Sequence, residues 1–585
     1  MRQIDDRGYG PLGQSANALV MIQQLEHTSG KREGHGNITT SSAAQRPRTS
    51  SAVRRETYQR LNDIKKTIWL TRPDLQQLFA DNPARFDWWL LFNGADEYRA
   101  LAEVEVVIDE ALLTQPAPEA FPDLQPMLTR FMRVVWAMRP DLRQVFDLRE
   151  RAGQAGFIQW YFRHGLQELQ LDRFLTDAQR QWWNRVQPHQ TQPAAKPSKH
   201  RAPANLPFGV NLIGYAKGQL GIGEDVRMAA LALQAVGIPF SIYNVEPGRE
   251  VCQGDDSALA HISTDLPYAI NLFCTTGIEM ARLAAIEGSR LFDGRRSIGH
   301  WPWELPEWPR DWHHAYDLVD ELWAASRFTF DAYARSCPKP VHHMPMAVTV
   351  DPSAGLTRSD FRLPEHRFLF VFSFDGLSSL VRKNPWACVQ AFRTAFPRGD
   401  EPVGLVVKVM RAPDDDPLWQ ATLAESQADR RIMIASGTLR RAELLDLYRA
   451  CDCFVSLHRS EGFGRGIAEA MLLGKPVIAT GYSGNLDFTV PGSAALVDYR
   501  LETVAKDEYP FAEGLTWAEP DTDHAAWWMR RLSMDAPWRT RLATHGQRLA
   551  HATYSPAIIG AIYASRLQIP DSCRAPRSDP FLSPR

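Results

Sequence analysis

The chain has 585 residues, of which 44% are hydrophobic, and it carries 66 basic and 68 acidic side chains. This length suits roughly three or four domains, and the balanced charge argues against a nucleic-acid partner, because a surface that binds nucleic acid needs a surplus of basic side chains. No run approaches the ~20 apolar residues that span a bilayer, and the start of the chain lacks the apolar core of a signal peptide, so we expect a cytoplasmic protein.

The first third of the chain divides into three parts. Residues 1–55 are rich in Ser, Thr, Gln, Gly and Arg and show no apolar periodicity, which predicts a disordered tail. Residues 56–190 have a helical pattern that is rich in tryptophan, and residues 191–205 fall in a segment of Pro, Lys and Ala that is typical of a linker. We therefore expect a helical domain that this linker separates from the rest of the chain.

The helical region contains an internal repeat. RPDLQQLF, which begins at Arg72, is matched by RPDLRQVF, which begins at Arg139. The match resumes with WLLFNGADE from Trp89 and WYFRHGLQE from Trp160. Two copies are too few for a solenoid, so we expect two related helical units that pack on each other.

Short β-rich runs alternate with helical ones after residue 205, as expected for parallel sheets with crossover helices. The strand candidates are GVNLIGY, FSIYN, YAINLFC, FLFVFSF, GLVVKVM, RIMIAS, CFVSLH and PVIAT. So many strands favour two doubly wound α/β domains over one. We place the first domain over 206–355 and the second over 356–567, followed by a tail over 568–585.

A glycine-rich loop in the second of these domains is predicted to bind an anion. The strand CFVSLH is followed by the loop RSEGFGRG and by a helix from about residue 465 to 473. In such a unit the free amides and the positive end of the helix dipole point beyond the carboxyl end of the sheet, where phosphates bind. The backbone at Gly462, Phe463 and Gly464 is therefore expected to hold a phosphate.

Two glutamates flank this loop. Glu469 lies about one turn inside the helix, which puts its carboxylate roughly 6 Å from the phosphates and beside the ribose hydroxyls of a nucleotide diphosphate. Glu461 begins the loop and faces the other side of the phosphates, where an attached sugar fits. Each glutamate alone is better explained as a solvated charge, but the pair at this spacing indicates a nucleotide-sugar site.

The segment EGFGRGIAE, with two glutamates separated by seven residues, resembles the signature of the retaining glycosyltransferases of family 4, which have the GT-B fold. Over about residues 208–567 the chain most resembles the branch of bacterial O-antigen and exopolysaccharide mannosyltransferases. The resemblance implies two Rossmann-like domains that face a cleft, here preceded by the helical N-terminal region. It also implies a metal-independent transfer with retention at the anomeric carbon, in which the leaving diphosphate takes the acceptor's proton.

The positive charges that this resemblance implies are only partly present. FDGLSSLVRKNPWACVQAF resembles the family segment that supplies a diphosphate-binding lysine, which would be Lys383. The family commonly has an arginine five positions earlier, where this chain has Ser378. Arg382, or Lys408 at the end of GLVVK, could take its place, and each is equally well explained as an ordinary surface charge.

Further segments resemble parts of the family's donor and acceptor sites. SGTLRRAEL, around Thr438, resembles the turn that lines the nucleobase, and GYSGNLDF, which contains Asn485, resembles the loop beside the donor sugar. WAEPDTDHAAWWMRRL resembles a C-terminal segment of the branch. In the first α/β domain KGQLGIGEDVR, with Gly221 and Gly223, resembles the loop that borders the donor diphosphate and the acceptor.

KGQLGIGEDVR also has a competing interpretation, as the glycine loop of a dinucleotide-binding dehydrogenase. Such a site requires an acidic residue at the end of the next strand, about 20 positions on. Asn244 stands there, with Glu246 just after it, and the glycine spacing is not G-x-G-x-x-G. We therefore disfavour the dehydrogenase.

An aromatic segment and an acidic segment each allow two interpretations. GHWPWELPEWPRDW contains His300 and Glu304, which could touch donor or acceptor among aromatic faces that suit sugars, although a packed tryptophan cluster is at least as good an explanation. PDDDP contains Asp414 and Asp416 at a spacing found in metal-bound nucleotide-sugar sites, but Asp416 before Pro417 is typical of a helix N-cap. We expect no metal.

The expected co-substrate is a nucleotide-diphosphate sugar, for which the branch suggests GDP-mannose, with no other cofactor. The expected reaction moves a hexose to a glycan or lipid-linked acceptor in surface polysaccharide synthesis, with peripheral contact to the inner membrane face or to an assembly complex as a further expectation. The alternative is a non-catalytic sugar-nucleotide-binding protein or assembly scaffold of the same fold, which Ser378 and the added helical repeats favour.

Overall fold

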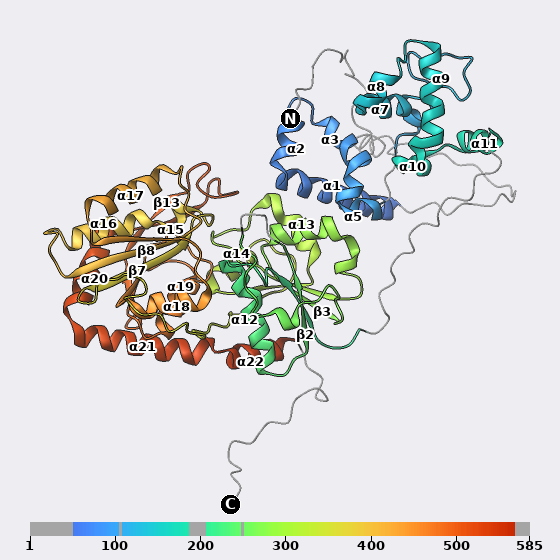
Figure 1. The fold of residues 1–585 in the computed structure, drawn as a ribbon. Helices are drawn as coiled ribbons and strands as arrows, with labels where there is room; N and C mark the ends of the chain where they lie inside the picture. Colours follow the sequence, from blue (N-terminus) through green and yellow to red (C-terminus); the bar gives the residue numbers. More distant parts are fainter. Residues whose placement is uncertain (1–50, 105–107, 187–205, 247–250, 568–585) are drawn as a thin grey trace, which may run out of the picture. The chain divides into compact units, whose positions relative to one another are not determined.

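The structure of the protein is a computed structural model that describes residues 51–104, 108–186, 206–246 and 251–567 (Figure 1). The predicted linker over 191–205 and the predicted tail over 568–585 lie outside the described residues, as does the predicted tail over 1–55 up to residue 50.

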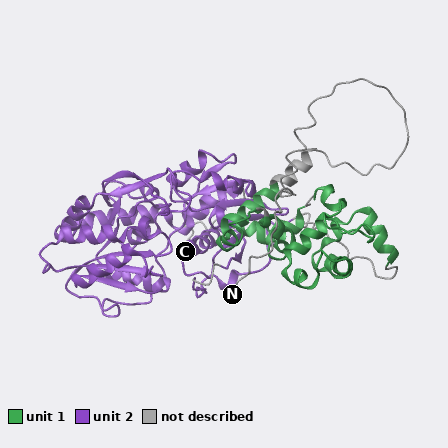
Figure 2. Ribbon diagram, turned by 90° about the horizontal axis from the view of Figure 1, so that it is seen from above, with its two compact units in different colours: residues 1–200, 281–291 green, residues 201–280, 292–585 purple. Residues whose placement is uncertain are grey.

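The described residues fall into two compact units (Figure 2). The first unit is residues 1–200 with 281–291, and the second is residues 201–280 with 292–585. The first unit is built on the helical region of the sequence, and the second contains both α/β domains, so the two units are described separately.

The first unit is helical, and both of its halves contain a short helix that begins at a proline, a second helix, a π-helical turn and a three-residue helix, in that order. The first half contains α1 (Ser51–Thr71), α2 (Pro73–Leu78), α3 (Ala84–Trp89), the π-helical turn η1 (Leu90–Gly94), α4 (Ala95–Glu97) and α5 (Arg99–Glu103). The second half contains α6 (Glu110–Thr114), α7 (Arg130–Met138), α8 (Pro140–Val145), α9 (Arg151–Trp160), the π-helical turn η2 (Tyr161–Gly165), α10 (Leu166–Glu168), η3 (Leu171–Phe174) and α11 (Asp177–Val186). The predicted tail boundary at residue 55 falls inside α1.

The sequence repeat is also a repeat of side-chain contacts. Arg72, just before α2, forms ion pairs with Asp74 at 2.7 Å and with Glu97 at 2.7 Å, and its guanidinium lies 6.0 Å from the ring of Trp89. The second copy makes the same three contacts, namely Arg139 with Asp141 at 2.7 Å, with Glu168 at 2.6 Å and with the ring of Trp160 at 5.8 Å. In each half the arginine therefore connects the start of one short helix to the end of the three-residue helix that follows the π-helical turn.

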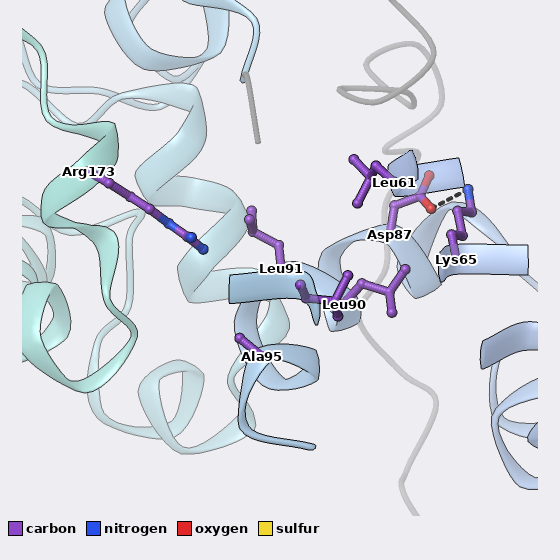
Figure 3. Close-up of a pocket in the computed structure, with 8 residues that line it drawn as sticks. Leu61, Lys65, Asp87, Leu90, Leu91, Ala95 and Arg173 are labelled. Atoms are coloured by element: carbon purple, nitrogen blue, oxygen red, sulfur yellow. Dashed lines mark ion pairs between the residues drawn. The ribbon is translucent and has the colours of Figure 1, made fainter. Parts of the chain in front are cut away.

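A pocket in the first unit is lined by apolar side chains between an ion pair and an arginine (Figure 3). Figure 3 shows an ion pair of Lys65 and Asp87 at one end, Arg173 at the other, and Leu90 and Leu91 between them. Burial raises the pKa of Asp87. None of the site residues predicted from the sequence lines this pocket.

The first α/β domain of the second unit is built on a parallel sheet in the order β2-β1-β3-β4-β5-β6. Its strands are β1 (Val210–Gly214), β2 (Phe240–Asn244), β3 (Ile270–Cys274), β4 (Arg296–His300), β5 (Glu321–Ala324) and β6 (Val341–His343). The helices along this part of the chain are α12 (Gly221–Ala235), η4 (Leu259–His261), α13 (Gly277–Glu287), η5 (Gly288–Leu291), η6 (Arg310–Leu318) and α14 (Arg327–Ala334), of which residues 281–291, in α13 and η5, are grouped with the first unit. β1 and β3 are buried at every position, as expected for parallel strands covered on both faces.

The second α/β domain has a parallel sheet in the order β12-β11-β10-β7-β8-β9. Its strands are β7 (Phe368–Asp375), β8 (Val403–Met410), β9 (Ile432–Ser436), β10 (Cys453–Ser456), β11 (Val477–Thr480) and β12 (Ala495–Val497). Its helices are α15 (Leu380–Lys383), α16 (Pro385–Ala395), α17 (Pro417–Ala428), α18 (Arg441–Ala450), α19 (Arg465–Leu472), η7 (Gly484–Asp487) and α20 (Thr522–Met534). The chain runs outward in both directions from β7 and β10, so the topological switch point lies between these two strands.

A separate antiparallel hairpin, β13 (Tyr499–Thr503) with β14 (Thr516–Pro520), follows β12. The chain then ends in α21 (Ala536–Tyr554) and α22 (Pro556–Leu567), which returns to the first α/β domain and packs on α12 (Figure 1). A Cβ added at Gly560 in α22 would meet the carbonyl oxygen of Ala232 at 2.2 Å, which shows how closely the two helices approach. Arg566 completes the contact by pairing with Glu321 on β5 at 2.6 Å.

The chain thus passes between the two α/β domains twice, first in the connection from β6 to β7 and again between α21 and α22. The two passages touch each other, because the Val348 amide donates a hydrogen bond to the Tyr554 carbonyl at 2.9 Å. The fold-class prediction of two doubly wound, Rossmann-like domains after a helical region is confirmed.

Candidate functional site

Lys383 and Glu461 meet at the switch point of the second sheet. Lys383 ends α15, which follows β7, and Glu461 lies in the loop that follows β10. The Lys383 Nζ donates a hydrogen bond to Glu461 Oε1 at 2.5 Å. Ligands of open parallel sheets bind beyond the carboxyl ends of the strands at the switch point, so this ion pair marks the candidate site.

The short helix α15 is held in place by a residue with positive φ at each end. Ser379 has a φ of 57°, and its hydroxyl caps α15 by accepting a hydrogen bond from the Arg382 amide at 3.2 Å. Asn384 has a φ of 54° and caps the next helix, α16, through the Ala387 amide at 3.3 Å. Such conformations cost about 1–3 kcal/mol each and cluster at functional sites.

Arg382 brings a second positive charge to Glu461. Its guanidinium is 2% exposed and lies 3.4 Å from Glu461 Oε2 and 3.7 Å from Glu304 Oε1. It also donates hydrogen bonds to the Ser378 hydroxyl at 2.6 Å and to the Ser460 carbonyl at 2.9 Å. Arg382 is therefore no surface charge, and Ser378 supports it.

The ionisation of this cluster follows from its burial and its charges. Burial would raise the pKa of Glu461, but the positive charges of Lys383 and Arg382 outweigh that effect and hold it at about 2. The neighbouring His458 is fully buried at the end of β10, and burial lowers its pKa to about 4. Burial also lowers the pKa of Lys383, while Glu461 acts in the opposite direction, and at neutral pH the cluster contains the ionised Glu461 carboxylate and a neutral His458 imidazole.

The glycine loop is clamped against the first α/β domain. The Gly462 carbonyl accepts hydrogen bonds from the hydroxyls of Ser326 at 2.6 Å and of Thr329 at 3.1 Å. A Cβ at Gly462 would meet the carbonyl oxygen of Trp303 at 2.6 Å, so the close approach requires glycine. Gly464 has a φ of 92° and forms the N-cap of α19, as the strand, loop and helix pattern predicts.

The side chain of Phe463 is placed in the protein core. Its ring packs 5.2 Å from that of Phe488 and 5.4 Å from that of Tyr554, and the residue is 5% exposed. Its side chain is therefore used for packing, which leaves the backbone amide as its group for a ligand.

Glu469 is ion-paired in the structure. Its carboxylate is 3% exposed and accepts a hydrogen bond at 2.8 Å from Arg441, which begins α18. Arg441 also lies 3.5 Å from Glu224 on α12 and donates to the Thr349 carbonyl at 2.7 Å. The carboxylate predicted to hold a ribose thus belongs to a charge network that joins the two α/β domains.

A second ion pair of the same network lies at the start of α12. Arg465, the first residue of α19, pairs with Asp225, whose pKa burial raises to about 6. Gly221 is exposed and has open space around its Cα, whereas a Cβ at Gly223 would meet the carbonyl oxygen of Gly218 at 2.5 Å. The start of α12 therefore lies beside the start of α19, and its own acidic side chains occupy the facing positions.

The remaining donor candidates lie farther along the same edge of the sheet. Lys408, on β8, donates from Nζ to the Gly437 carbonyl at 2.5 Å, and burial lowers its pKa to about 8. Thr438, the next residue after Gly437, is exposed. Asn485 is buried and donates to the Thr480 carbonyl at 3.0 Å, so its amide nitrogen is used to hold the loop.

The aromatic segment of the first α/β domain is mostly core. The ring of Trp301 is fully buried and lies 5.5 Å from that of Trp308. His300 is buried between Trp323 and other rings, and burial lowers its pKa to about 4. The expected packed tryptophan cluster is therefore present, and Glu304 is the member of the segment that reaches Arg382.

Three site residues had no part in the sequence-based prediction. They are His458, Arg441 and Tyr509, whose hydroxyl donates to Glu304 Oε2 at 2.5 Å. His458 could have been found from its position at the end of β10, where a polar residue follows a buried strand. Arg441 and Tyr509 act through contacts with segments more than 25 residues away, which no local pattern indicates.

Asp416 behaves as the sequence predicts. It caps α17 by accepting hydrogen bonds from the amides of Leu418 at 2.8 Å and Trp419 at 3.3 Å, with Pro417 at the first helical position. Within the described residues, no three His, Cys, Asp or Glu side chains are grouped as metal ligands would be. In that same part of the chain, no helix combines the length and the apolar character needed to cross a membrane.

Several solved structures have a similar arrangement of elements. Anabaena Alr3699/HepE, in complex with UDP and glucose, is 15% identical, with a TM-score of 0.44 over 62% of this chain and 99% of its own. Sucrose-phosphate synthase from Thermosynechococcus elongatus is 15% identical, with a TM-score of 0.45 over 61% of this chain and 98% of its own. A glycosyltransferase from Rickettsia africae is 11% identical, with a TM-score of 0.46 over 62% of this chain and 98% of its own. At these identities the likenesses say nothing about substrate.

No curated protein is similar enough in sequence to count as a relative of this chain. The family comparison covers the part of the chain that carries Glu461, the glycine loop, Glu469 and Arg441. That part, residues 424–519, matches the family model of glycosyl transferases group 1.

Proposed function

We propose that the second unit is a glycosyltransferase that takes its sugar from a nucleotide-diphosphate donor held at the switch point of the second sheet. The observation that carries the proposal is the meeting of Lys383 and Glu461 from the loops after β7 and β10, directly before the N-terminus of α19. Cations and free helix amides at such a place suit a diphosphate.

The donor diphosphate would take over partners that are now used within the protein. In the structure Lys383 and Arg382 both pair with the single carboxylate of Glu461. A bound diphosphate would accept hydrogen bonds from these two cations and from the amides of Gly462 and Gly464, and Glu461 would then be free to accept hydroxyls of the sugar. Because Glu461 already lies beside the two cations, the two added negative charges would leave the site with more negative than positive charge, so the free amides at the start of α19 are needed as further donors to the diphosphate.

The same groups would act in the reaction by placement and charge. As the bond between the sugar and the diphosphate breaks, negative charge grows on the departing phosphate oxygen, where Lys383 and Arg382 stabilise it. We propose retention at the anomeric carbon, with the acceptor's proton passing to the leaving diphosphate. Neither Glu461, with a pKa of about 2, nor His458, with a pKa of about 4, is a strong base.

The ribose and base would lie toward α18. Glu469 is the carboxylate for the ribose hydroxyls, and the exposed Thr438 turn is the surface for the base. We propose a hexose donor, with GDP-mannose as the first choice, and a glycan or lipid-linked acceptor of surface polysaccharide synthesis. Cytoplasmic location with contact to a membrane or an assembly complex belongs to the same proposal.

A second candidate is a sugar-nucleotide-binding or assembly scaffold without turnover. It is favoured by one observation, which is that the predicted donor groups are already satisfied inside the protein. Lys383 and Arg382 face Glu461, and Glu469 faces Arg441. A protein that never releases these pairs would not transfer a sugar.

Binding of nucleotides tests both candidates. We expect one of UDP, GDP, ADP or their hexose conjugates, added without metal, to raise the melting temperature and to give a measurable heat of binding. Glu469→Ala should weaken that binding by about ten-fold or more, because a charge-assisted hydrogen bond contributes about 1.5–3 kcal/mol. Glu425→Ala, which removes a carboxylate from a surface ion pair with Arg393 in the same domain, is the matched control.

Turnover separates the two candidates. Release of nucleoside diphosphate that depends on an added glycan or lipid-linked acceptor would establish a transferase. Tight donor binding without such release across a broad acceptor panel would favour the scaffold. No binding of any nucleotide to the wild type would contradict both.

A further inference from the structure

The β13–β14 hairpin brings a tyrosine into the charge cluster. Its loop over 504–515 carries Tyr509, which donates a hydrogen bond from its hydroxyl to Glu304 Oε2 at 2.5 Å. The ring of Tyr509 lies 5.8 Å from that of Trp303 and 6.0 Å from the guanidinium of Arg382. Tyr509 therefore touches a carboxylate of the first α/β domain and a cation of the second.

The loop is fixed on both sides of Tyr509. On one side the hydroxyl of Ser379, the cap of α15, donates to the Glu508 carbonyl at 3.0 Å. On the other side Phe511 packs edge-on against Trp312, with the ring centres 5.7 Å apart. Phe511 has a φ of 56°, a conformation that is unfavourable for a residue other than glycine and that the surrounding contacts must maintain.

The base of the hairpin is joined to the loop that carries Glu461. Arg459, two residues before Glu461, donates to Glu519 on β14 at 2.6 Å, and its carbonyl accepts from the Ala518 amide at 3.0 Å. The Arg459 amide in turn donates to the Arg382 carbonyl at 2.8 Å. The hairpin is thus built into the candidate site and is not a surface appendage.

Water is the competitor of any sugar acceptor at such a site. In hydrolysis, a water oxygen forms a bond to the anomeric carbon while the bond from that carbon to the diphosphate oxygen breaks. The diphosphate leaves with the electron pair, the proton of the water passes to it, and the products are free sugar and nucleoside diphosphate. A transferase must therefore cover the anomeric carbon on the side from which the acceptor arrives.

We propose that Tyr509 is a positioning residue that keeps water from the sugar's anomeric carbon. Its ring shields that carbon, and its hydrogen bond to Glu304 holds the ring in place. This inference rests on the proposed function, because it requires a bound nucleotide sugar. The ring stands beside Arg382, next to the Lys383–Glu461 pair where the diphosphate and sugar are expected. The hydroxyl holds Glu304 until an acceptor hydroxyl takes its place.

The test measures hydrolysis of the donor without any acceptor. UDP-glucose, GDP-mannose and ADP-glucose are each incubated with wild type and with Tyr509→Ala, and free hexose is quantified, with donor affinity measured by calorimetry. We expect Tyr509→Ala to hydrolyse the bound donor about ten-fold faster, the effect of lowering the barrier to water by ~1.4 kcal/mol, with donor affinity changed less than two-fold. Tyr509→Phe keeps the ring but removes the hydrogen bond to Glu304, and it should raise hydrolysis by a smaller factor than Tyr509→Ala.

Two further variants make the result specific. Phe511→Ala loosens the same loop at Trp312 without removing a group from the cluster, and it should also raise hydrolysis. Tyr499→Ala removes a tyrosine from the same hairpin whose ring packs on Tyr482, and it should leave hydrolysis unchanged. Melting temperatures of all variants identify any that fail to fold.

The possible outcomes distinguish this inference from the proposed function. Donor binding with equal hydrolysis in wild type, Tyr509→Ala and Phe511→Ala would overturn the role of Tyr509 and leave the donor site intact. Failure of the wild type to bind any of the three donors would overturn the proposed function and this inference with it. Faster hydrolysis in Tyr499→Ala would also overturn the role of Tyr509, because any change in the hairpin would then increase hydrolysis.

Discussion

Arg382 donates a hydrogen bond to the hydroxyl of Ser378 at 2.6 Å, one helical turn earlier in the chain. Ser378 stands where the resemblance to a known family leads one to expect an arginine, and the structure shows a second cation reaching the site from position 382 instead. The same guanidinium lies within 4 Å of Glu461 and Glu304. The short side chain of Ser378 leaves room for the Arg382 guanidinium, and a long side chain at position 378 would compete with it for the same space.

Removal of Arg382 should be strongly destabilising. Arg382→Ala leaves Glu461 and Glu304 with less compensation in a buried site, which costs about 3–5 kcal/mol of the free energy of unfolding. Ser378→Ala, which removes one hydrogen-bond acceptor, should cost about 1 kcal/mol. Unfolding in urea, followed by tryptophan fluorescence, measures both effects.

Arg393→Ala is the matched control for this series. Arg393 is 53% exposed and pairs with Glu425 on the surface of the same domain, so its loss should cost at most about 1 kcal/mol. Equal stability of Arg382→Ala and Arg393→Ala would show that the cluster around Glu461 is hydrated and not buried.

The neutral His458 predicts a loss of stability in acid. Its pKa is about 4 in the fold and about 6.5 in an unfolded chain. Below pH 6.5 the unfolded chain binds a proton that the folded chain does not, so the free energy of unfolding falls as the pH decreases from about 6.5 to about 4. Above pH 6.5 His458 is neutral in both states, and the free energy of unfolding is not reduced by its protonation.

His458→Gln should remove this part of the pH dependence. Between pH 7 and pH 5 the wild type should lose about 2 kcal/mol that the variant retains, as measured by urea unfolding at the two pH values. His366→Gln, which changes an exposed histidine, is the control. A wild-type loss that persists unchanged in His458→Gln would show that His458 accepts a proton in the folded state.

The close approach of the glycine loop to Trp303 predicts a size limit at position 462. A Cβ there would lie 2.6 Å from a backbone oxygen, which cannot move away as a flexible side chain could. Gly462→Ala should therefore cost about 1–3 kcal/mol and displace the loop amides, so that nucleotide binding is lost. Thermal unfolding and calorimetric titration with nucleotides measure the two effects.

Gly221→Ala provides the comparison for stability. Gly221 is also next to a candidate site and at the start of a helix, but a Cβ there meets nothing within 4 Å. We expect it to unfold at or slightly above the wild-type temperature, since alanine is the better helix former. Equal stability of Gly462→Ala and Gly221→Ala would contradict the prediction, because it would show that the loop can move away from the Trp303 carbonyl without loss of stability.

Local patterns in the sequence were enough to predict the loops of the second sheet. The run of apolar residues before Glu461 and the glycines after it predict a strand, a loop and a helix, and a helix from 465 to 473 was expected where α19 covers Arg465–Leu472. Lys383 was expected near Glu461 from a resemblance, and the structure brings them to 2.5 Å. The strand, loop and helix around Glu461 follow from the local pattern, whereas Lys383 followed only from the resemblance.

Other parts were missed because their signals are weak or distant. β4, β5 and β6 are three to five residues long and contain charged or histidine residues, so no apolar run marks them. The contact of Tyr509 with Glu304 joins positions 205 residues apart. The pairing of Glu469 with Arg441 replaces the open carboxylate expected from helix geometry, because only the folded chain brings α18 beside α19.

The hydrogen bond between Val348 and Tyr554, 2.9 Å long, has a consequence for movement of the two α/β domains. Both passages of the chain between the domains run through this one place. Two domains joined by two adjacent chain connections can rotate about the line through these connections, but the connections oppose sliding and twisting. We therefore expect any opening of the two domains to be a hinge motion, in which parts distant from Val348 and Tyr554 separate most while the two connections stay together.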